Sequence, residues 1–266
     1  MPRRSAANPD GLKIFDTHCH LNDRQFANDL NAVMKRAYQA GVKEILTVST
    51  SVPDSQENVI LCRKYPNTYC AVGIHPHEAD SFRSFDIQTL KDMCIEPQVK
   101  AIGETGLDFF RGFSTKANQE TAFRAQIELA KMLNLPLVIH IRDAAQPAMA
   151  ILEEHGYFKG ILHCFSDGRK FAEWAVEKGF YISFAGSLTY GEKRLIEVAK
   201  TVPQDRILIE TDAPYLIPEP ERGPGKRNEP AFIRLTLQFL AQALNFTPAE
   251  VADLTRENAH RCLQIT

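Results

Sequence analysis

Imidazole and carboxylate side chains lie in, or directly after, short apolar runs of this sequence. They are His18, His20, Glu104, His140, His163 and Asp212. Runs of aliphatic and β-branched residues are typical of buried β-strands. Because these side chains are far apart along the chain, they can form one site only where the ends of several strands meet. Together they predict a metal centre, since nitrogen and carboxylate ligands without thiolates suit Mg²⁺, Mn²⁺ or Zn²⁺.

The first run carries three polar side chains at alternate positions. Asp16, His18 and His20 are two residues apart, so in an extended strand they share one face. Two imidazoles on one face can chelate a cation, but taken alone such a pair is also compatible with solvated or core histidines. The other candidate ligands favour the metal hypothesis.

Glu104 ends a β-branched run and is flanked by Gly103 and Gly106, which tolerate tight backbone angles. A carboxylate has two oxygens and can bridge two cations. His140, His163 and Asp212 each follow an apolar run, near the carboxyl end of the expected strand. In a parallel α/β fold, ligands and catalytic groups collect at that end.

The hydrophobic pattern predicts strands alternating with helices. Helical spacing is clear at Phe123, Ile127 and Ala130, and Thr247 to Glu250 predicts a capped final helix. The fold class is therefore α/β: a single (β/α)₈ TIM barrel over residues 12–266 with an extra C-terminal helix, after a flexible tail at 1–11. The expected strands are 13–18, 44–50, 68–74, 99–104, 136–141, 160–164, 180–184 and 206–211.

Composition excludes several classes of protein. The 266 residues carry 31 basic and 33 acidic side chains, a net charge of −2, so no global basic surface for tight duplex binding is expected. No apolar run is long enough for a signal peptide core or a membrane span. We expect a cytoplasmic monomer without membrane association or an obligate protein partner.

The six cysteines are scattered, which indicates reduced core thiols rather than a disulfide framework. Cys19 and Cys164 adjoin candidate ligands. On a regular strand each would point away from its neighbouring histidine, so neither is expected to bind the metal.

The chain resembles the TatD family of metal-dependent deoxyribonucleases, a branch of the amidohydrolase-like metallohydrolases. The similarity runs from near residue 14 to near residue 263. The matching segments are Phe15-Asp-Thr-His-Cys-His20, Gly73-Ile-His-Pro-His77, Ile102-Gly-Glu-Thr-Gly-Leu-Asp108, Leu137-Val-Ile-His-Ile-Arg-Asp-Ala144, Leu162-His-Cys-Phe-Ser166, Ile209-Glu-Thr-Asp-Ala-Pro-Tyr215 and Arg227-Asn-Glu-Pro230. One departure is Asp167, where relatives commonly have glycine.

The resemblance implies two divalent ions, Mg²⁺, Mn²⁺ or Zn²⁺, bridged by Glu104. One ion would be held by His18, His20, Glu104 and Asp212, and the other by Glu104, His140 and His163. Asp212 is the expected general base for an attacking water. The implied activity is hydrolysis of phosphodiester bonds in DNA, at the 3′ end of single strands, with RNA as an alternative substrate.

Five further side chains lie on loops after strands and are candidates for binding the substrate. They are His75, His77, Arg142, Arg227 and Asn228. Arginine can grip a phosphate with two hydrogen bonds, although a solvated surface role is open for both arginines.

Other residues have two interpretations each. Asp16 and Asp108 either orient histidine ligands or simply end strands. Phe109, Phe110 and Phe113, beside Arg111, either stack on a nucleobase or pack against the protein.

Two alternative functions remain open at this point. One is a metal-dependent deacylase of D-aminoacyl-tRNA or a hydrolase of small amides and esters, since related barrels use a similar metal site. The other is a metal-binding scaffold without catalysis.

Overall fold

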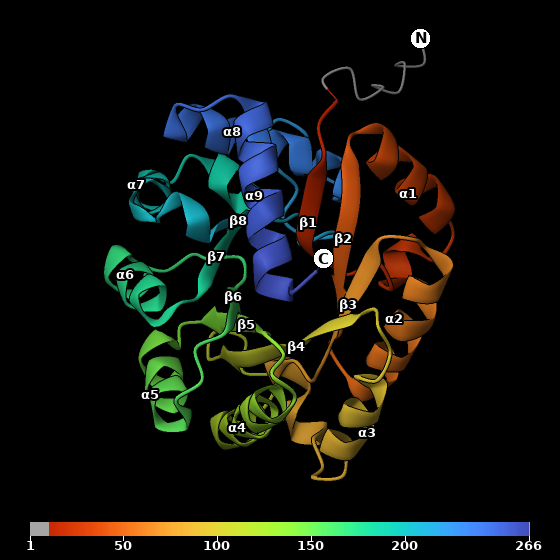
Figure 1. Ribbon diagram of the computed structural model, residues 1–266, viewed down its shortest axis with the longest axis vertical. Coiled ribbons are helices and arrows are strands. Elements are labelled where there is room, and N and C mark those ends of the chain that lie inside the picture. Colours follow the sequence, from red (N-terminus) through yellow and green to blue (C-terminus); the bar gives the residue numbers. More distant parts are fainter. Residues whose placement is uncertain (1–10, 266) are drawn as a thin grey trace.

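The computed structural model describes residues 11–265, so the expectation of a tail at 1–11 lies almost wholly outside the described residues. The described chain forms a ring of parallel strands with helices around it (Figure 1). The strands of residues 11–265 are β1 (Ile14–Cys19), β2 (Val42–Val48), β3 (Thr68–Val72), β4 (Val99–Asp108), β5 (Leu137–Arg142), β6 (Gly160–Leu162), β7 (Tyr181–Phe184) and β8 (Ile207–Ile209).

The strands pair in chain order, from β1 to β8, and every pair is parallel. Beyond the end of β8, the backbone returns to β1 and nearly closes the ring. The Asp212 N–H donates to the carbonyl of His18 at 2.9 Å, and the His20 N–H donates to the carbonyl of Ala213 at 2.8 Å. The predicted TIM barrel is confirmed.

Helices connect the strands and cover the outside of the ring. Their apolar faces pack on the strands, which are therefore buried on both sides and consist of nearly continuous apolar runs. The α-helices of the described chain are α1 (Leu30–Gln39), α2 (Val52–Lys64), α3 (Asp86–Met93), α4 (Lys116–Leu133), α5 (Ala145–His155), α6 (Arg169–Lys178), α7 (Lys193–Thr201), α8 (Ile233–Leu244) and α9 (Pro248–Leu263). Short 3₁₀ turns are η1 (Arg24–Phe26), η2 (Pro76–Ser81), η3 (Gly186–Tyr190), η4 (Gln204–Arg206) and η5 (Pro230–Phe232).

The extra C-terminal helix is present as predicted, and it closes the amino-terminal end of the barrel. Thr247 and Glu250 form the expected capping box at its start. In Figure 1, α9 lies across the middle of the ring. Its buried side chains Ala259, Cys262 and Leu263 join the core that fills the barrel interior. The strand residues of that interior core are Phe15, Leu46, Val48, Ala71, Ala101, Val138, Ile161, Tyr181 and Leu208.

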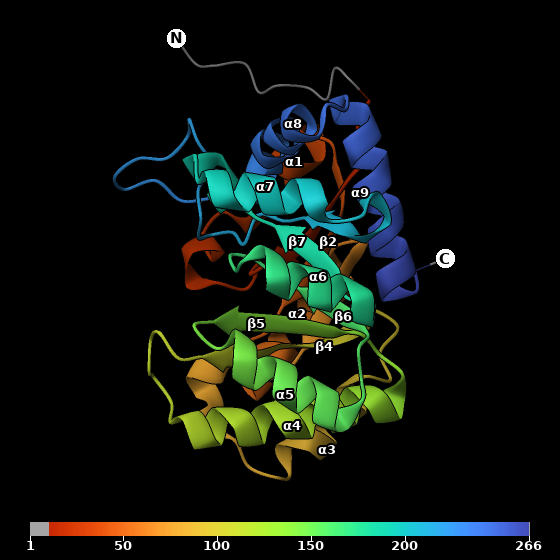
Figure 2. The same ribbon diagram turned by 90° about the vertical axis from the view of Figure 1, so that its left-hand side faces the viewer.

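The opposite end of the barrel, at the carboxyl ends of the strands, carries the candidate metal ligands. Figure 2 shows α9 on one side of the molecule and the arrowhead of β5 pointing to the other. Polar side chains replace the apolar interior at that end: His18, Glu104, His140 and His163 lie near the carboxyl ends of β1, β4, β5 and β6. Within residues 11–265, no helix combines the length and apolar character needed to cross a lipid bilayer.

Candidate metal centre

Glu104 is the central residue of the cluster at the carboxyl ends of the strands. Its Oε2 atom lies 3.3 Å from Nε2 of His18 and 3.7 Å from Nε2 of His20. Asp212 completes this side, because its Oδ1 atom lies 3.3 Å from Nε2 of His20 and 3.7 Å from Nε2 of His18. His18 and His20, at the end of β1, therefore face one oxygen of Glu104, and Asp212, after β8, faces both imidazoles.

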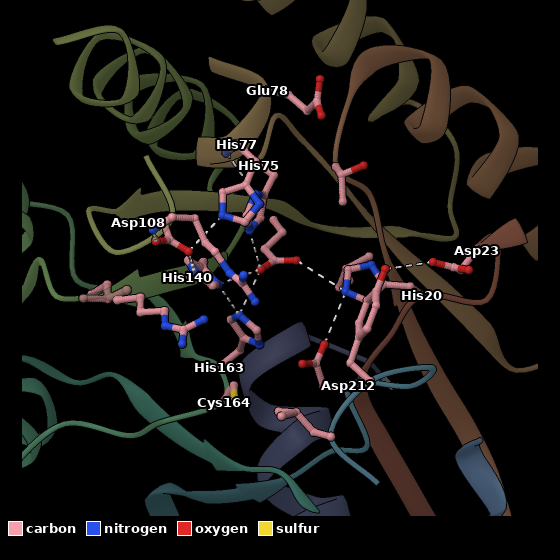
Figure 3. Close-up of a pocket in the computed structure, with 18 of the residues that line it drawn as sticks. His20, Asp23, His75, His77, Glu78, Asp108, His140, His163, Cys164 and Asp212 are labelled. Atoms are coloured by element: carbon pink, nitrogen blue, oxygen red, sulfur yellow. Dashed lines mark hydrogen bonds and ion pairs between the residues drawn. The ribbon is translucent and has the colours of Figure 1, made fainter. Parts of the chain in front are cut away.

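The second oxygen of Glu104 faces a different group of imidazoles. Its Oε1 atom lies 2.9 Å from Nε2 of His163, 3.1 Å from Nδ1 of His140 and 3.2 Å from Nε2 of His75. Figure 3 shows His20 and Asp212 on one side of the pocket and His75, His140 and His163 on the other. The carboxylate therefore stands between two sets of ligand atoms, the arrangement expected of a bridging ligand.

The backbone around Glu104 depends on its two glycines. Gly103 has φ +151°, and a Cβ atom there would lie 2.6 Å from the carbonyl oxygen of Val138. Gly106 has φ +133°, and a Cβ atom would collide with the carbonyl oxygen of His140. Because only glycine permits this close approach of β4 and β5, the pair of glycines positions Glu104 beside His140.

A carboxylate orients His140 from the side away from Glu104. Asp108 Oδ2 lies 3.1 Å from Nε2 of His140 and 2.9 Å from Nε2 of His77. Burial would raise the pKa of Asp108, but hydrogen bonds from His140, the Arg111 backbone and His77 outweigh it and lower that pKa. An ionised Asp108 only accepts, so His140 donates through Nε2, and its Nδ1 lone pair faces Glu104.

His163 has a comparable partner in Glu210. Its Nδ1 atom lies 3.3 Å from Glu210 Oε1, which also accepts the N–H of Cys164 at 2.8 Å. The Nε2 atom of His163 is then directed at Glu104. A buried carboxylate behind a ligating imidazole fixes the ring orientation and increases its basicity.

Burial and charge in the cluster match a set of metal ligands. Burial would raise the pKa of Glu104, but the neighbouring imidazoles of His163, His75 and His18 hold it well below its ordinary value. Burial lowers the pKa of His75 to about 4, and it also lowers the pKa of His18. Burial would also lower the pKa values of His20, His140 and His163, but the neighbouring carboxylates raise all three. A metal ion would take the place of the protons on these rings, because imidazole binds a cation only when it is deprotonated.

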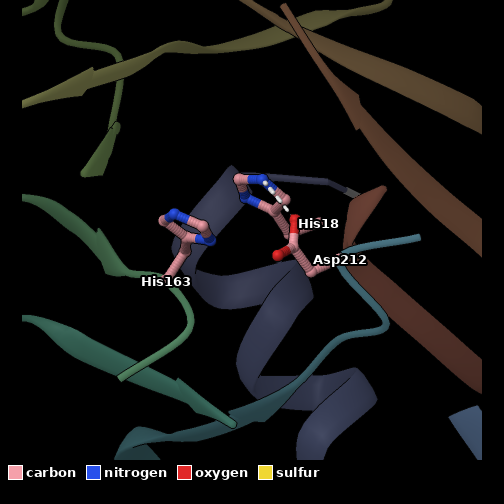
Figure 4. A group of neighbouring side chains, drawn as sticks. All are labelled: His18, His163 and Asp212. Atoms are coloured by element: carbon pink, nitrogen blue, oxygen red, sulfur yellow. Dashed lines mark ion pairs between the residues drawn. The ribbon is translucent and has the colours of Figure 1, made fainter. Parts of the chain in front are cut away.

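An unpaired buried nitrogen also fits a metal ion. Among the described residues, Nε2 of His18 is fully buried and has no hydrogen-bond partner. It points at oxygens of Glu104 and Asp212, which cannot donate when ionised. A buried polar atom without a partner is costly, and a cation held by these groups would satisfy it. Figure 4 shows His18, His163 and Asp212 converging. Within residues 11–265, this is one of three sets of side chains whose ligand atoms lie within 4.8 Å of one another.

The cluster opens into a pocket of about 790 Å³, within the range of small-molecule and cofactor sites. Loops after several strands form its walls, and both charged and aromatic side chains line it. Its rim includes Asp23, Arg111, Phe113, Arg142 and Tyr215. A substrate can therefore reach Glu104 and Asp212 from solvent.

Comparisons with known proteins agree with this geometry. The model of the family described as TatD related DNase matches residues 15–264. The chain belongs to the TatD family. It is 40% identical to an uncharacterized metal-dependent hydrolase, YabD, of Bacillus subtilis, over 95% of this chain and 99% of that protein. It is 35% identical to the 3′-5′ ssDNA/RNA exonuclease TatD of Salmonella typhimurium, with the same coverage.

A solved structure supports the same conclusion. The TatD homologue YjjV of Escherichia coli superposes with a TM-score of 0.90 at 27% identity, covering 96% of this chain and all of that one. This protein is accordingly a TatD-family metal-dependent hydrolase with a barrel fold.

In this TatD-family protein, the six side chains predicted as metal ligands are brought together at one end of the barrel. Three predicted substrate-binding residues, His75, His77 and Arg142, line the same pocket. His75, however, lies in the group around Glu104 Oε1 rather than at the rim. Its Nε2 atom is as close to the carboxylate as those of the predicted ligands. We therefore group His75 with the ligands.

Arg227 and Asn228 lie elsewhere, and neither is among the described residues that line the pocket. Arg227 pairs with both carboxylate oxygens of Asp29, at 2.9 and 2.8 Å. Asn228 is fully buried and donates to the carbonyls of Thr211 at 2.9 Å and Tyr215 at 2.6 Å. The polar groups of both residues anchor the loop after β8, and direct contact of either residue with a substrate stays a prediction.

Asp108, Asp16 and Glu210 have different hydrogen-bond partners. Asp108 is confirmed as a partner of histidines. Asp16 is not, since its carboxylate accepts from the backbone and hydroxyl of Thr211 at 2.9 and 2.6 Å. Sequence reasoning gave no role to Glu210. Glu210 directly follows β8 and lies two residues before Asp212, and this spacing could have indicated that it points toward the same site.

Cys164 also departs from the expectation of a side chain that points away from the site. It lines the pocket because its backbone is left-handed, with φ +44°, and not extended. Cys164 belongs to none of the ligand groups among the described residues.

Proposed function

We propose that this protein hydrolyses phosphodiester bonds at the 3′ ends of single-stranded DNA, using two divalent cations held on either side of Glu104. The observation that carries the proposal is the placement of one Glu104 oxygen against His18 and His20 and the other against His163 and His140. Two ions bridged in this way are typical of enzymes that transfer phosphoryl groups.

The ligand atoms divide into two sets. His18, His20 and Asp212 would hold one ion with Glu104 Oε2, while His75, His140 and His163 would hold the other with Glu104 Oε1. Mg²⁺, Mn²⁺ and Zn²⁺ all accept such ligands. When bound, the ions lower the pKa of water and stabilise negative charge on the attacking and leaving oxygens.

Asp212 is the proposed general base. It lines the pocket, so a water molecule beside the ligand cluster can reach it. Burial would raise the pKa of Asp212, but the hydrogen bond from His20 and the neighbouring imidazoles lower it. Asp212 is therefore ionised and can accept the proton of the attacking water.

Positively charged side chains at the rim fit a phosphodiester substrate. Arg111 and Arg142 line the pocket, and the guanidinium of Arg142 lies 4.0 Å from the centre of the Phe110 ring. With a net charge of −2, the protein must recognise phosphate locally, and guanidinium groups do this well. The name of the Salmonella relative, an exonuclease of single-stranded DNA and RNA, is consistent with this substrate.

The test follows 5′-labelled single-stranded DNA with Mg²⁺ or Mn²⁺, with and without EDTA. We expect a ladder of shortened labelled products that EDTA and the Glu104→Ala substitution both abolish. Glu177→Ala, which removes an exposed carboxylate of α6, is the matched control and should cleave like the unchanged protein. Full turnover by Glu104→Ala would overturn the two-ion mechanism.

The same assay separates the alternative functions. Intact DNA, together with metal-dependent release of the amino acid from D-aminoacyl-tRNA or hydrolysis of a small ester, would establish the deacylase or small-molecule activity instead. Bound metal without turnover on any of these substrates would indicate a scaffold.

We also infer that the protein acts as a monomer in the cytoplasm. The described cysteines are all free, which suits a reducing compartment. Sedimentation analysis and cell fractionation test the two inferences. A dimer, or recovery in the medium, would contradict them.

A further inference from the structure

The loop between β4 and α4 places an exposed aromatic ring beside the metal centre. Phe113 is 64% exposed and lines the pocket. Among the exposed large apolar side chains of the described chain, only Phe113 and Tyr215 line the pocket. An aromatic ring that is exposed at the wall of a pocket is available for stacking on a ligand that enters the pocket.

The Phe113 ring is linked to the metal centre through His77. The two rings meet edge to face, with centroids 4.8 Å apart and planes at 90°. His77 is held by Asp108, which also holds the metal-centre residue His140. Three contacts thus connect the exposed ring to a proposed ligand, His140.

The backbone of this loop is fixed at both ends. Asp108 Oδ1 accepts the N–H groups of Phe110 at 3.0 Å and Arg111 at 2.8 Å. At the other end, the Ser114 hydroxyl donates to the carbonyl of His77 at 2.8 Å. These bonds hold the chain on both sides of Phe113, so less of the loop has to be ordered when a ligand binds.

Two guanidinium groups line the same pocket as Phe113 and lie near the ring of Phe110. Arg142 and Arg111 contact the Phe110 ring, at 4.0 and 5.9 Å from its centre. Across residues 11–265, neither arginine forms an ion pair with a carboxylate, so both charges are available to an anion in the pocket. We call Phe110, Arg111, Phe113 and Arg142 the arginine–aromatic lip.

The three phenylalanines of this segment have different surroundings. Phe109 is partly buried against the core, with Lys116 4.4 Å from its ring centre. The Phe110 ring lies against the guanidinium groups of Arg142 and Arg111. The rings of Phe113 and His77 meet edge to face, and Phe113 remains largely exposed at the pocket. The packing interpretation therefore suits Phe109 but not Phe113.

We propose that Phe113 stacks on a base of single-stranded nucleic acid, whose phosphates lie against Arg111 and Arg142. This inference rests on the proposed nuclease function and adds the feature that selects single strands. A base can present its face to a ring only when it is not stacked within a duplex, and every base has such a face. The lip therefore favours single strands without selecting one base.

The first experiment measures binding in the inactive Glu104→Ala background, with oligonucleotides that carry one 2-aminopurine at successive positions. Stacking quenches the fluorescence of this base. We expect quenching at one position, retained in Phe113→Tyr and lost in Phe113→Leu, which keeps an apolar side chain without the ring. Phe85→Leu, at a ring that is 69% exposed and outside the pocket, is the matched control and should quench normally.

The second experiment measures whether the losses of affinity from removing the Phe113 ring and from removing the base depend on each other. An abasic nucleotide at the quenched position should weaken binding about five-fold to one-hundred-fold with Phe113 present, and should have little further effect in Phe113→Leu. Equal losses in both proteins would overturn the proposal, as would unchanged quenching in Phe113→Leu. Arg142→Ala should lower the slope of log affinity against log salt by about 0.7 for one lost phosphate contact.

The two proposals can fail separately. If the unchanged protein degrades single-stranded DNA but Phe113→Leu has the same KM, only the stacking proposal is wrong. If the metal-loaded, unchanged protein neither binds nor degrades the oligonucleotide, the nuclease function is wrong and the stacking proposal falls with it.

Discussion

Asp108 and Glu104 hold the imidazole of His140 from opposite sides. Asp108 Oδ2 lies 3.1 Å from Nε2 of this ring, and Glu104 Oε1 lies 3.1 Å from Nδ1. The contact with Asp108 fixes which nitrogen keeps its proton, so the nitrogen facing Glu104 is free to bind a cation. Asp108 is thereby a positioning residue for the metal centre.

Replacement of Asp108 should therefore weaken metal binding. Asp108→Asn keeps an oxygen for the loop N–H groups but loses the charge beside His140 and His77. We expect the affinity for Mn²⁺ to fall about 10-fold to 100-fold, with an unchanged circular dichroism spectrum. Competition with a chelator measures this, and Asp92→Asn on the exposed face of α3 is the control. Equal affinity in both variants would refute the positioning role.

Metal removal should lower stability without unfolding the barrel. The interior core of Phe15, Leu46 and Val138, closed by Leu263 of α9, is separate from the metal centre. Saturating Mn²⁺ at about 100 times its Kd adds about 2.7 kcal/mol, so EDTA should lower Tm by about 5 to 10 °C. Thermal unfolding followed by circular dichroism provides the measurement. Loss of the folded signal at 25 °C in EDTA would contradict the expectation.

Asn228 should matter for stability more than for direct substrate contact. Asn228→Ala leaves the buried carbonyl of Thr211 and the carbonyl of Tyr215 without their donor, and Glu229 N–H without its acceptor. We expect the free energy of unfolding to fall by about 2 to 4 kcal/mol.

Urea unfolding tests this expectation, with Asn31→Ala at an exposed site as control. A change in KM with unchanged stability would instead support a substrate-binding role for Asn228.

The capping box at the start of α9 should contribute to stability but not to catalysis. Thr247 accepts from the N–H of Glu250 at 3.2 Å, and the Glu250 carboxylate accepts from the N–H of Thr247 at 2.7 Å. Thr247→Ala should lower the free energy of unfolding by about 1 kcal/mol, while Thr247→Ser should restore most of it. Turnover should remain unchanged in both. A loss of activity at a temperature where the variant is folded would show that α9 affects the metal centre.

The sequence determined the order and position of the barrel strands. Parallel strands are buried on both faces, so each leaves an apolar run that is recognisable locally. The predicted limits agree with the structure within two residues, except that β4 continues to Asp108. That extension was not predicted because residues 104–108 are polar or glycine apart from Leu107, which is unusual in a buried strand and reflects the polar cluster at this end of the barrel.

The sequence also indicated the six ligand candidates, because strand ends converge in any parallel barrel. It could not assign the remaining polar residues. His75 and Arg227 both follow strands and were given the same role, yet His75 lies 3.2 Å from Glu104 and Arg227 pairs with Asp29. Likewise, Phe109 and Phe113 are four residues apart in one loop, and only their exposure separates packing from binding.

These distinctions depend on partners that are distant along the chain. Local periodicity is set by a residue's neighbours within a few positions, so it records which face of an element is buried. Whether a polar side chain binds a metal, orients a ligand or anchors a loop depends on what the closed barrel places opposite it. For Asp108 and His140, and for Arg227 and Asp29, the tertiary structure alone decided the pairing.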